Sequence, residues 1–471
     1  MNRFVSWLLN IVYVGLLVIF SPMILYRAVV HGKYRQGFRQ KFFGLVPELP
    51  RLQAPKRRIW FHAVSVGEIN VLRPLLEMIR QEQPDWECVI STTSLTGMQL
   101  AERLYGAEYT VFYCPLDFSW AVFTAMRRIR SNMLVLAEQE IWPNLFYAAK
   151  KHRVKLALIN GRFGEGGYRR YKRFRFFFKP ILRMLDLIAV QSETYAGWFH
   201  CVGAYGHTIE ITGSMKFDGA QTDRTNPKTV QLANLAGIDA NSQVDSDIIF
   251  LAGSTQEPEE AYALDVYEKL KDDWPQLKLI LVPRHPERFE VVASLLDDRG
   301  VDWMRRTQLD SNPDKKGKRI LLVDCVGELG AWWGVSEIAF VGGSMGSRGG
   351  QNMLEPAAFG AAVSFGPNTK NFRDIVDLLL QNDAAIVVHD SNDMHKFVQK
   401  CLEQPGFARQ LGDQGRELVK RNLGATRKTL DLLKNRLEDT PLILENFTHA
   451  TFPRRNPGKQ TGKRNKKRHK P

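Results

Sequence analysis

Short apolar runs alternate with amphipathic stretches along most of the chain. In the first half these runs predict strands, separated by helical patterns, at residues 58–64, 88–92, 109–113, 133–137, 155–159, 187–190 and 209–212. Strands that are apolar at successive positions are typical of a parallel sheet covered by helices on both faces. The pattern therefore predicts a doubly wound α/β domain.

The same pattern returns after a polar stretch with weak periodicity, residues 222–247, which predicts a linker. A second series of strands is predicted at residues 248–252, 278–282, 320–323, 338–341, 362–365 and 385–388. The end of this region, residues 407–437, predicts amphipathic helix. Two α/β domains in tandem predict a cleft between them, with ligands at the carboxyl ends of the strands.

The N-terminus carries a longer apolar stretch. The 23 residues from Phe4 to Tyr26 contain no formal charge, and a helix needs about 20 apolar residues to cross a bilayer. Five basic residues follow this stretch and one, Arg3, precedes it, which favours a cytoplasmic body. A cleaved signal peptide is the alternative, but no small-residue cleavage site follows. The sequence predicts an uncleaved, single-pass anchor in the cell inner membrane.

The net charge of +15 is concentrated at the two ends of the chain. Residues 1–41 contribute six basic residues, residues 453–471 contribute nine, and neither segment contains an acid. The body is therefore formally neutral, which predicts no nucleic-acid partner for it. Five scattered cysteines without CxxC spacing argue against a disulfide framework and against a zinc site.

Carboxylates and a lysine follow the predicted strands of the first half. Glu68 lies three residues after a serine, a spacing that suits a helix-capping box as well as a catalytic base. Glu138 and Glu140 follow another strand, and alternation would send them to opposite faces if that strand continued, so they should not share one role. Lys216 lies near the predicted domain junction, where a solvated lysine is the alternative.

In the second half, residues 338–360 predict a strand, a glycine-rich loop and a helix that begins near Asn352. Such loops and helix N-termini bind phosphate, although a flexible turn is the alternative. Asn352 and Glu355 are i, i+3 neighbours and can face one ligand. Arg284 follows a strand and suits a phosphate oxygen. Glu328 follows another strand and is either a ligand residue or a helix cap.

Residues 162–183 interleave eight basic residues with seven aromatic residues. This composition predicts contact with an anionic membrane surface, and the alternatives are nucleic-acid binding or a core-packed helix with a basic outer face. Asp245-Ser246-Asp247 has the spacing of a metal-binding DxD motif. It precedes a predicted strand rather than following one, so a structural role is predicted, and no metal site.

The motifs, in this order, resemble those of bacterial 3-deoxy-D-manno-octulosonic acid (Kdo) transferases, GT-B glycosyltransferases of lipopolysaccharide synthesis. The resemblance covers roughly residues 1–435, and its matching strings are His62–Glu68, Glu138–Asn144, Thr212–Asp218, Pro283–Phe289, Val326–Leu329 and Gly349–Glu355. Gln351 stands where the family commonly has His, and the basic tail after residue 452 is additional.

The resemblance implies transfer of Kdo from CMP-Kdo to the lipid A precursor (lipid IVA), with no cofactor and no metal. Glu68 matches the family's catalytic base, and Glu138 and Lys216 match positions of transition-state stabilisation. A single displacement with one base implies inversion at the anomeric carbon. The matching CMP-sugar site consists of Pro283, Arg284, Val326, Gly327, Glu328, Asn352, Met353, Leu354 and Glu355.

Two alternatives use the same fold: another membrane-associated GT-B transferase that takes a UDP-sugar, and a nucleotide-sugar epimerase. Glu68 at a helix N-terminus is expected to stay ionised, because the helix dipole stabilises a carboxylate there. The predicted division is a membrane anchor (1–30), an acceptor-binding Rossmann-like domain (31–225), a nucleotide-sugar-binding Rossmann-like domain (226–440) and a basic, disordered tail (441–471).

Overall fold

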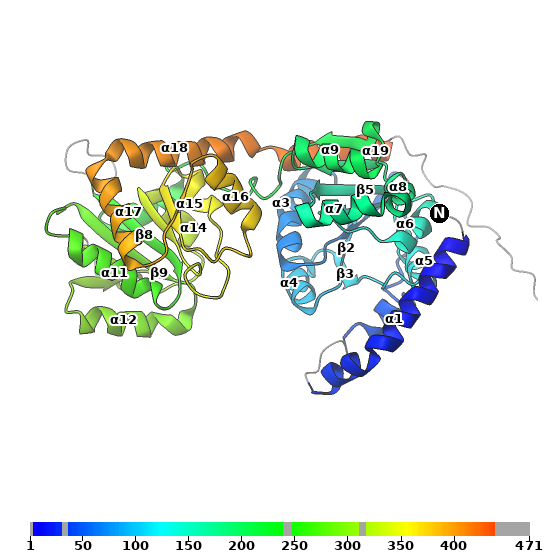
Figure 1. Ribbon diagram of the computed structural model, residues 1–471, viewed down its shortest axis with the longest axis horizontal. Helices are drawn as coiled ribbons and strands as arrows, with labels where there is room; N and C mark the ends of the chain where they lie inside the picture. Colours follow the sequence, from blue (N-terminus) through cyan, green and yellow to red (C-terminus); the bar gives the residue numbers. More distant parts are fainter. Residues whose placement is uncertain (1–2, 31–35, 239–246, 310–316, 439–471) are drawn as a thin grey trace, which may run out of the picture.

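The computed structural model describes residues 3–30, 36–238, 247–309 and 317–438. Two parallel sheets, each of seven strands, form the centres of two domains that lie side by side (Figure 1). This architecture confirms the predicted GT-B-like α/β fold. The predicted basic tail, residues 441–471, lies outside the described residues.

The first sheet has the strand order β3-β2-β1-β4-β5-β6-β7. Its seven strands lie within two residues of the predicted runs, and side chains alternate between two apolar cores, with Trp60 in one and Ile59 and Phe61 in the other. The strands are β1 (Arg57–His62), β2 (Trp86–Thr92), β3 (Thr110–Tyr113), β4 (Met133–Ala137), β5 (Lys155–Gly161), β6 (Leu187–Val190) and β7 (Ile209–Ile211).

Helices cover both faces of this sheet, which is why its strands are apolar at successive positions. They are α2 (Phe38–Phe43), α3 (Val66–Glu82), α4 (Leu95–Tyr105), α5 (Ser119–Ile129), α6 (Pro143–Lys151), α7 (Glu165–Arg173), α8 (Arg175–Leu182) and α9 (Glu193–Val202), with a short 3₁₀ turn, η1 (Gly206–Thr208).

The second sheet has the order β10-β11-β9-β8-β12-β13-β14. Six of its strands confirm the predicted series, and the seventh, the edge strand β10, was missed because only one of its three side chains, Met304, is buried, so it forms no apolar run. The strands are β8 (Ile248–Thr255), β9 (Leu277–Pro283), β10 (Trp303–Arg305), β11 (Ile320–Leu322), β12 (Ile338–Val341), β13 (Ala362–Phe365) and β14 (Ile386–Val387).

The helices of the second domain include one inside the stretch predicted as a linker. α10 (Pro227–Ala236) is capped by Asn226 and packs Leu232 and Ala236 into the second core, so that prediction was wrong for its described part. The others are α11 (Glu259–Leu270), α12 (Phe289–Asp298), α13 (Arg306–Leu309), α14 (Leu329–Trp332), α15 (Leu354–Ala358), α16 (Arg373–Gln381) and α17 (Ser391–Glu403), with η2 (Pro286–Arg288) and η4 (Trp333–Val335).

The helical end of the chain returns to the first domain, as Figure 1 shows. α18 (Pro405–Asn422) covers the second domain, the chain turns at Gly424 with φ of 90°, and α19 (Ala425–Glu438) packs on α3. Leu430 and Leu433 of α19 lie in a core of the first domain. The predicted division places this helix with the second domain, whereas its side chains pack in the first.

The N-terminal helix α1 (Arg3–Val30) lies at the edge of the first domain beside α5 (Figure 1). Its segment Val5–Met23 has a mean hydropathy of 1.9 and is long and apolar enough to cross a membrane, and 11% of the most apolar window is buried within the protein. Length and composition therefore agree with the predicted anchor.

Strand order reverses at one point in each sheet, and ligands bind in the crevice at such a point. In the first sheet it lies between β1 and β4, whose carboxyl ends lead to Glu68 and Glu138. In the second it lies between β8 and β12, which lead to Thr255 and Gly342. The topology thus places the predicted catalytic carboxylates at the crevice of the first domain.

Candidate active site

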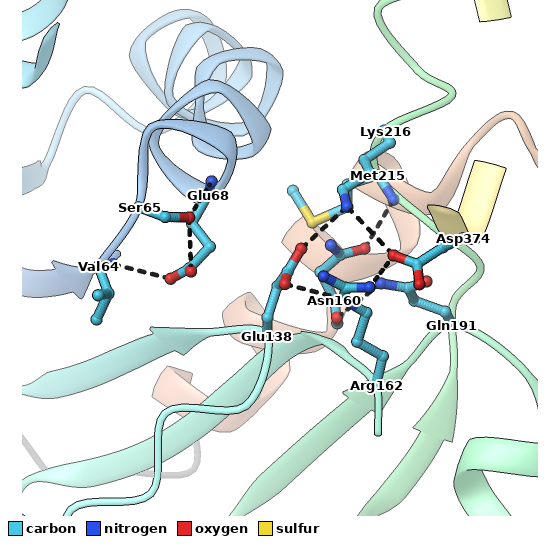
Figure 2. Close-up of polar contacts among 10 residues, drawn as sticks. All are labelled: Val64, Ser65, Glu68, Glu138, Asn160, Arg162, Gln191, Met215, Lys216 and Asp374. Carbon is cyan, nitrogen blue, oxygen red and sulfur yellow. Dashed lines mark hydrogen bonds and ion pairs between the residues drawn. The ribbon is translucent and has the colours of Figure 1, made fainter. Parts of the chain in front are cut away.

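Glu68 lies in the first turn of α3, and its carboxylate is fixed by the residues just before the helix (Figure 2). The Glu68 N–H donates to Ser65 Oγ (3.3 Å), and the Ser65 hydroxyl donates to Glu68 Oε1 (2.8 Å). Val64 N–H donates to Oε2 (2.8 Å). A capping arrangement is therefore present, and it also aims the carboxylate at the crevice edge.

The loop that carries Val64 is itself tied to the end of β2. The Val64 carbonyl accepts hydrogen bonds from Thr92 Oγ1 (3.1 Å) and Ser94 Oγ (2.9 Å). A Cβ at Gly97 would lie 2.6 Å from each of these hydroxyl oxygens, so glycine is needed for the loops to approach this closely. Glu68 is thus held by two strand ends, not by its own helix alone.

Burial sets the protonation of Glu68. Glu68 is only 8% exposed. Desolvation raises the pKa of its carboxyl to about 7, although the hydrogen bonds from Val64 and Ser65 act to lower it. The helix N-terminus was expected to keep Glu68 ionised, whereas a carboxyl with a pKa of about 7 is only partly ionised at neutral pH, because desolvation outweighs the hydrogen bonds that favour the charged form. A base with a pKa near neutrality is well matched to proton abstraction at physiological pH.

Glu138 follows β4 in a left-handed conformation, with φ of 58°. The strand ends at Ala137, and this left-handed conformation stops the alternation assumed from the sequence, although the Glu138 N–H still donates to the carbonyl of Ile159 on the neighbouring strand (2.9 Å). Glu140 accepts a hydrogen bond from Trp142 Nε1 (2.8 Å), and burial raises the pKa of its carboxyl. The two carboxylates thus bind different groups, although the charge of Glu138 contributes to the raised pKa of Glu140; their separate roles stay a prediction.

Two cations hold the Glu138 carboxylate. Arg162 Nε donates to Oε2 (2.9 Å), and Lys216 Nζ lies 3.2 Å from Oε1. Figure 2 shows this group beside Glu68, with no dashed line joining the two. The negative charge of Glu138 nevertheless contributes to the raised pKa of Glu68. The three residues predicted to be catalytic thus lie close together, beyond the carboxyl ends of the first sheet's strands.

The second domain reaches the same group through α16. Asp374 forms an ion pair with Arg162, and its Oδ2 lies 3.9 Å from Lys216 Nζ (Figure 2). Sequence reasoning missed both Arg162 and Asp374. The position of Arg162 directly after the predicted strand 155–159 was an available signal for the first, whereas Asp374 lies at an ordinary helix start.

Asn160 holds the main chain next to Lys216 in place. It too has a left-handed conformation, with φ of 52°, and its Oδ1 accepts the N–H of Met215 (3.1 Å), the residue before Lys216. Gln191 Nε2 donates to the Asn160 carbonyl (3.0 Å). Among the described residues the buried Asn160 Nδ2 has no hydrogen-bond partner. Left-handed residues at the ends of two adjacent strands are typical of functional sites.

In the second domain, Pro283 ends β9 and Arg284 follows it. The Arg284 N–H donates to the Thr255 carbonyl (3.0 Å), and its side chain is exposed. Burial raises the pKa of Glu355, and the nearby charge of Arg284 opposes that shift. Arg284 and Glu355, from separate predicted motifs, are thereby brought close together.

The predicted loop around Glu328 is positioned by an ion pair. Arg306 Nε and Nη2 donate to the two Glu328 oxygens (2.9 and 3.0 Å), and Lys228 lies 3.5 Å away. The Glu328 side chain caps no helix N–H, so the capping alternative does not hold. Val326 is 76% exposed and Gly327 has φ of 95°, which leaves this loop open to solvent.

The helix predicted to begin near Asn352 is α15, which begins at Leu354. Asn352 accepts the N–H of Leu354 (3.2 Å) and donates to Glu355 Oε1 (3.0 Å). Met353 and Leu354 are buried in the core of the second domain, so these two residues offer only main-chain atoms to a ligand.

Part of the glycine-rich loop already binds an internal carboxylate. Gly343, Ser344 and Met345 donate their N–H groups to the buried Glu259 (2.7, 2.9 and 2.9 Å). A Cβ at Gly342 would lie 2.7 Å from Glu259 Oε2, which explains glycine there. These three donors are therefore not available to a phosphate, contrary to the sequence expectation, and Glu259 was not singled out from the sequence.

The basic, aromatic segment 162–183 forms α7 and α8, and most of its aromatic residues pack inward. Phe163 is buried, and Tyr168 stacks on Trp198 with ring centroids 4.6 Å apart. Phe174 and Phe176 are exposed, at 46% and 80%. The core-packing alternative thus describes most of this segment.

Of the DxD motif, Asp245 and Ser246 lie outside the described residues, and Asp247 pairs with Lys278 (2.6 Å). The carboxylate of Asp247 is therefore engaged in an ion pair within the second domain.

Known proteins of similar sequence indicate the family to which this chain belongs. Residues 36–219 match the sequence profile of the family described as "3-Deoxy-D-manno-octulosonic-acid transferase (kdotransferase)". A 3-deoxy-D-manno-octulosonic acid transferase of Haemophilus influenzae is 30% identical over 433 residues, which cover 90% of this chain and 98% of that protein. The enzyme of the same name from Chlamydia muridarum is 29% identical, with 88% and 94% covered.

A solved structure extends the comparison to the fold. The UDP-GlcNAc 2-epimerase of Neisseria meningitidis, bound to UDP-GlcNAc, aligns with 80% of this chain and all of that chain, with a TM-score of 0.51 and 10% identity. At that identity the likeness shows a shared fold. Identity over nearly the whole length of the Haemophilus protein shows more: this chain belongs to the Kdo transferase family, glycosyltransferases of lipopolysaccharide synthesis.

Proposed function

We propose that the chain transfers Kdo from CMP-Kdo to the lipid A precursor (lipid IVA), with inversion at the anomeric carbon. One observation carries the proposal. Glu68, buried and with a pKa near 7, lies at the crevice beside a Lys216–Glu138 pair that the second domain contacts through Asp374. The first domain, residues 31–225, is assigned to the acceptor and the second, residues 226–440 apart from α19, to the nucleotide sugar.

In this reaction Glu68 takes the proton of the acceptor hydroxyl. The hydroxyl oxygen forms a bond to the anomeric carbon of Kdo while the bond from that carbon to the CMP phosphate breaks. The proton ends on Glu68, and CMP leaves from the opposite face, which inverts the configuration. Ser65 and Val64 hold the carboxylate in place, so that little reorientation is needed during the step.

Negative charge develops on the departing phosphate, and cations compensate for it. Lys216 is held for this task by Glu138, while Arg284 and the main chain at Asn352–Glu355 are assigned to the nucleotide. Val326, Gly327 and Glu328 line the same predicted site. Because these groups supply the positive charge and the donors, the proposal includes no metal and no cofactor.

The pH dependence of transfer follows from Glu68. A base acts only when deprotonated, so we expect kcat/KM to rise with pH through about 7 and to fall about tenfold per unit below it. The measurement is a pH–rate profile at a low donor concentration. A rate that stays level from pH 5.5 to 8.5 would remove Glu68 as the base.

The assignment of Arg284 predicts a donor-binding defect. Loss of a charge-assisted hydrogen bond costs roughly 1.5–3 kcal/mol, so Arg284→Ala should weaken CMP-Kdo binding about 10- to 100-fold in calorimetry. Arg409→Ala, at an exposed position of α18, is the matched control and should bind normally. An unchanged dissociation constant for Arg284→Ala would make Arg284 a structural residue.

The acceptor is an anionic glycolipid, so the chain is placed at the inner membrane with its body on the cytoplasmic side. α1 supplies the attachment, and the basic residues that follow it favour this side. The single-pass crossing predicted from the sequence is one form of this attachment. No nucleic-acid partner enters the proposal.

A further inference from the structure

One face of α1 is polar. Ser6, Asn10 and Tyr13 are spaced at i, i+4 and i+7, which places them on the same side of the helix. Polar side chains in an apolar helix normally face a protein partner rather than lipid. The partners of these three residues therefore indicate where the helix lies.

All three bind side chains of the first domain. The Ser6 hydroxyl donates to Asn144 Oδ1 (2.6 Å). Asn10 Nδ2 donates to Ser119 Oγ (2.7 Å), and the Ser119 N–H donates back to Asn10 Oδ1 (3.0 Å). The next turn of α1 continues the row, since the Tyr13 hydroxyl donates to Asp117 Oδ2 (3.1 Å).

These partners are part of the framework of the folded body. Asp117 accepts the N–H groups of Asn144 (3.0 Å) and Leu145 (2.8 Å) at the start of α6, and Asn144 Nδ2 donates to the Asp117 carbonyl (2.6 Å). Asn144 is fully buried and Asp117 is 5% exposed. The first turns of α1 are therefore bound to a rigid polar network between α5 and α6.

This docking is not compatible with a crossing that leaves the body on the cytoplasmic side. At about 1.5 Å per residue, Ser6 and Tyr26 are separated by roughly 30 Å, the thickness of the hydrocarbon layer. Ser6 would then lie at the far membrane surface, and Asp117 and Asn144 would lie within or beyond the lipid. An ionisable group at that depth is costly.

Outside this polar row, most of the described side chains of α1 are apolar and exposed. Trp7, Val18 and Ile19 are each between 65% and 69% exposed. An aromatic patch adjoins the helix, and the buried Phe118 joins the two: it lies 6.1 Å from Tyr13 and 6.2 Å from Phe42 of α2, measured between ring centroids. At its rim the exposed residues are Phe38 (50%), Phe43 (50%) and Trp120 (44%). Exposed Trp and Phe residues are typical of a surface that inserts into the membrane interface.

We propose that α1 lies along the membrane surface, docked on the first domain through Ser6, Asn10 and Tyr13, with its apolar sides and the α2 aromatic patch in lipid. The proposal rests on the membrane attachment given above and replaces the crossing by an in-plane helix. It keeps the N-terminus on the cytoplasmic side. It also fixes the orientation of the first domain, and hence of Glu68, relative to the surface that holds the acceptor.

The side on which the N-terminus lies distinguishes the two attachments. In the full chain carrying Asn2→Cys, expressed in its host, a membrane-impermeant maleimide should label residue 2 only after the cells are permeabilised. Cys201, exposed on the body, reports whether the inner membrane was intact. Labelling of residue 2 in intact spheroplasts, with Cys201 protected, would overturn the proposal.

A disulfide test examines the docking directly. In native membranes treated with a mild oxidant, Asn10→Cys/Ser119→Cys should form an intrachain disulfide, found by mass spectrometry of the linked peptides. Ile11→Cys/Ser119→Cys is the matched control, because Ile11 lies about 100° around the helix and is 49% exposed; it should give at least tenfold less. The docking would be contradicted if the Asn10→Cys/Ser119→Cys pair gave no disulfide, or no more disulfide than the Ile11→Cys/Ser119→Cys control.

Neither readout requires transfer activity, so failure of the proposed reaction would leave both results unchanged. A chain that does not sediment with membranes would instead contradict the attachment on which the inference rests. Asn10→Leu provides an independent check. Removing the central pair of hydrogen bonds should at least halve the yield of a second disulfide, Ser6→Cys/Asn144→Cys, and an unchanged yield would contradict the role of the polar row.

Discussion

Replacing Glu68 with Gln is expected to reduce Kdo transfer by about 10²–10⁴-fold, the range of general-base catalysis. The variant keeps the shape of the side chain and an acceptor for the Ser65 hydroxyl, so folding and donor binding should persist. Transfer is measured as CMP release under saturating donor and acceptor. Glu77→Gln, on an exposed part of the same helix, is the matched control and should retain full activity.

The same variant should not lose stability at alkaline pH. The pKa of Glu68 is raised from 4.5 to about 7, so the folded chain binds this proton more tightly than the unfolded chain does. The contribution of this proton to the stability of the folded chain is complete below pH 4.5 and is lost as pH rises through 7. Gln resembles the protonated form, so the difference in Tm, variant minus wild type, should increase from pH 5 to pH 8. A difference that decreases over this range would contradict the burial effect.

Lys216→Ala is expected to lower kcat by about 10²–10³-fold, the loss seen when a group that stabilises transition-state charge is removed. Lys216 contacts Glu138 and lies near Asp374, so its ammonium is positioned before any ligand arrives. Because its role lies in the transition state, the dissociation constant for CMP-Kdo should change little. Single-turnover kinetics together with calorimetry separate the two quantities.

Lys269→Ala, at an exposed position of α11, is the control for loss of a lysine and should leave kcat unchanged. If Lys216→Ala weakened donor binding while preserving kcat, Lys216 would be a ground-state ligand of the donor. The role proposed for the Lys216–Glu138 pair would then be wrong.

Much of the fold could be read from the sequence, because buried parallel strands contain runs of successive apolar residues. β4, for example, lies where the run 133–137 predicted it. β10 buries only Met304, and α10 buries only Thr229, Leu232, Ala233 and Ala236, so neither element forms a marked apolar run. The return of α19 to the first domain depends on tertiary packing of Leu430 and Leu433, which no local pattern encodes.

The site was partly predictable for a related reason. Glu68, Glu138 and Lys216 each follow a strand, and parallel strands bring their carboxyl ends to one edge. Asp374 comes from the other domain, so its pairing with Arg162 depends on how the two domains meet. The pKa of Glu68 was misjudged, since burial depends on the whole fold and local capping does not report it.

The central claim is that this chain joins Kdo from CMP-Kdo to a lipid A precursor. The most direct measurement incubates the purified full chain with CMP-Kdo and lipid IVA in detergent, quantifies CMP, and determines the mass of the lipid by mass spectrometry. One CMP should be released for each Kdo gained by the lipid, with no transfer from UDP-sugars. An unmodified lipid in the presence of properly folded protein, or sugar gained only from a UDP-sugar, would contradict it.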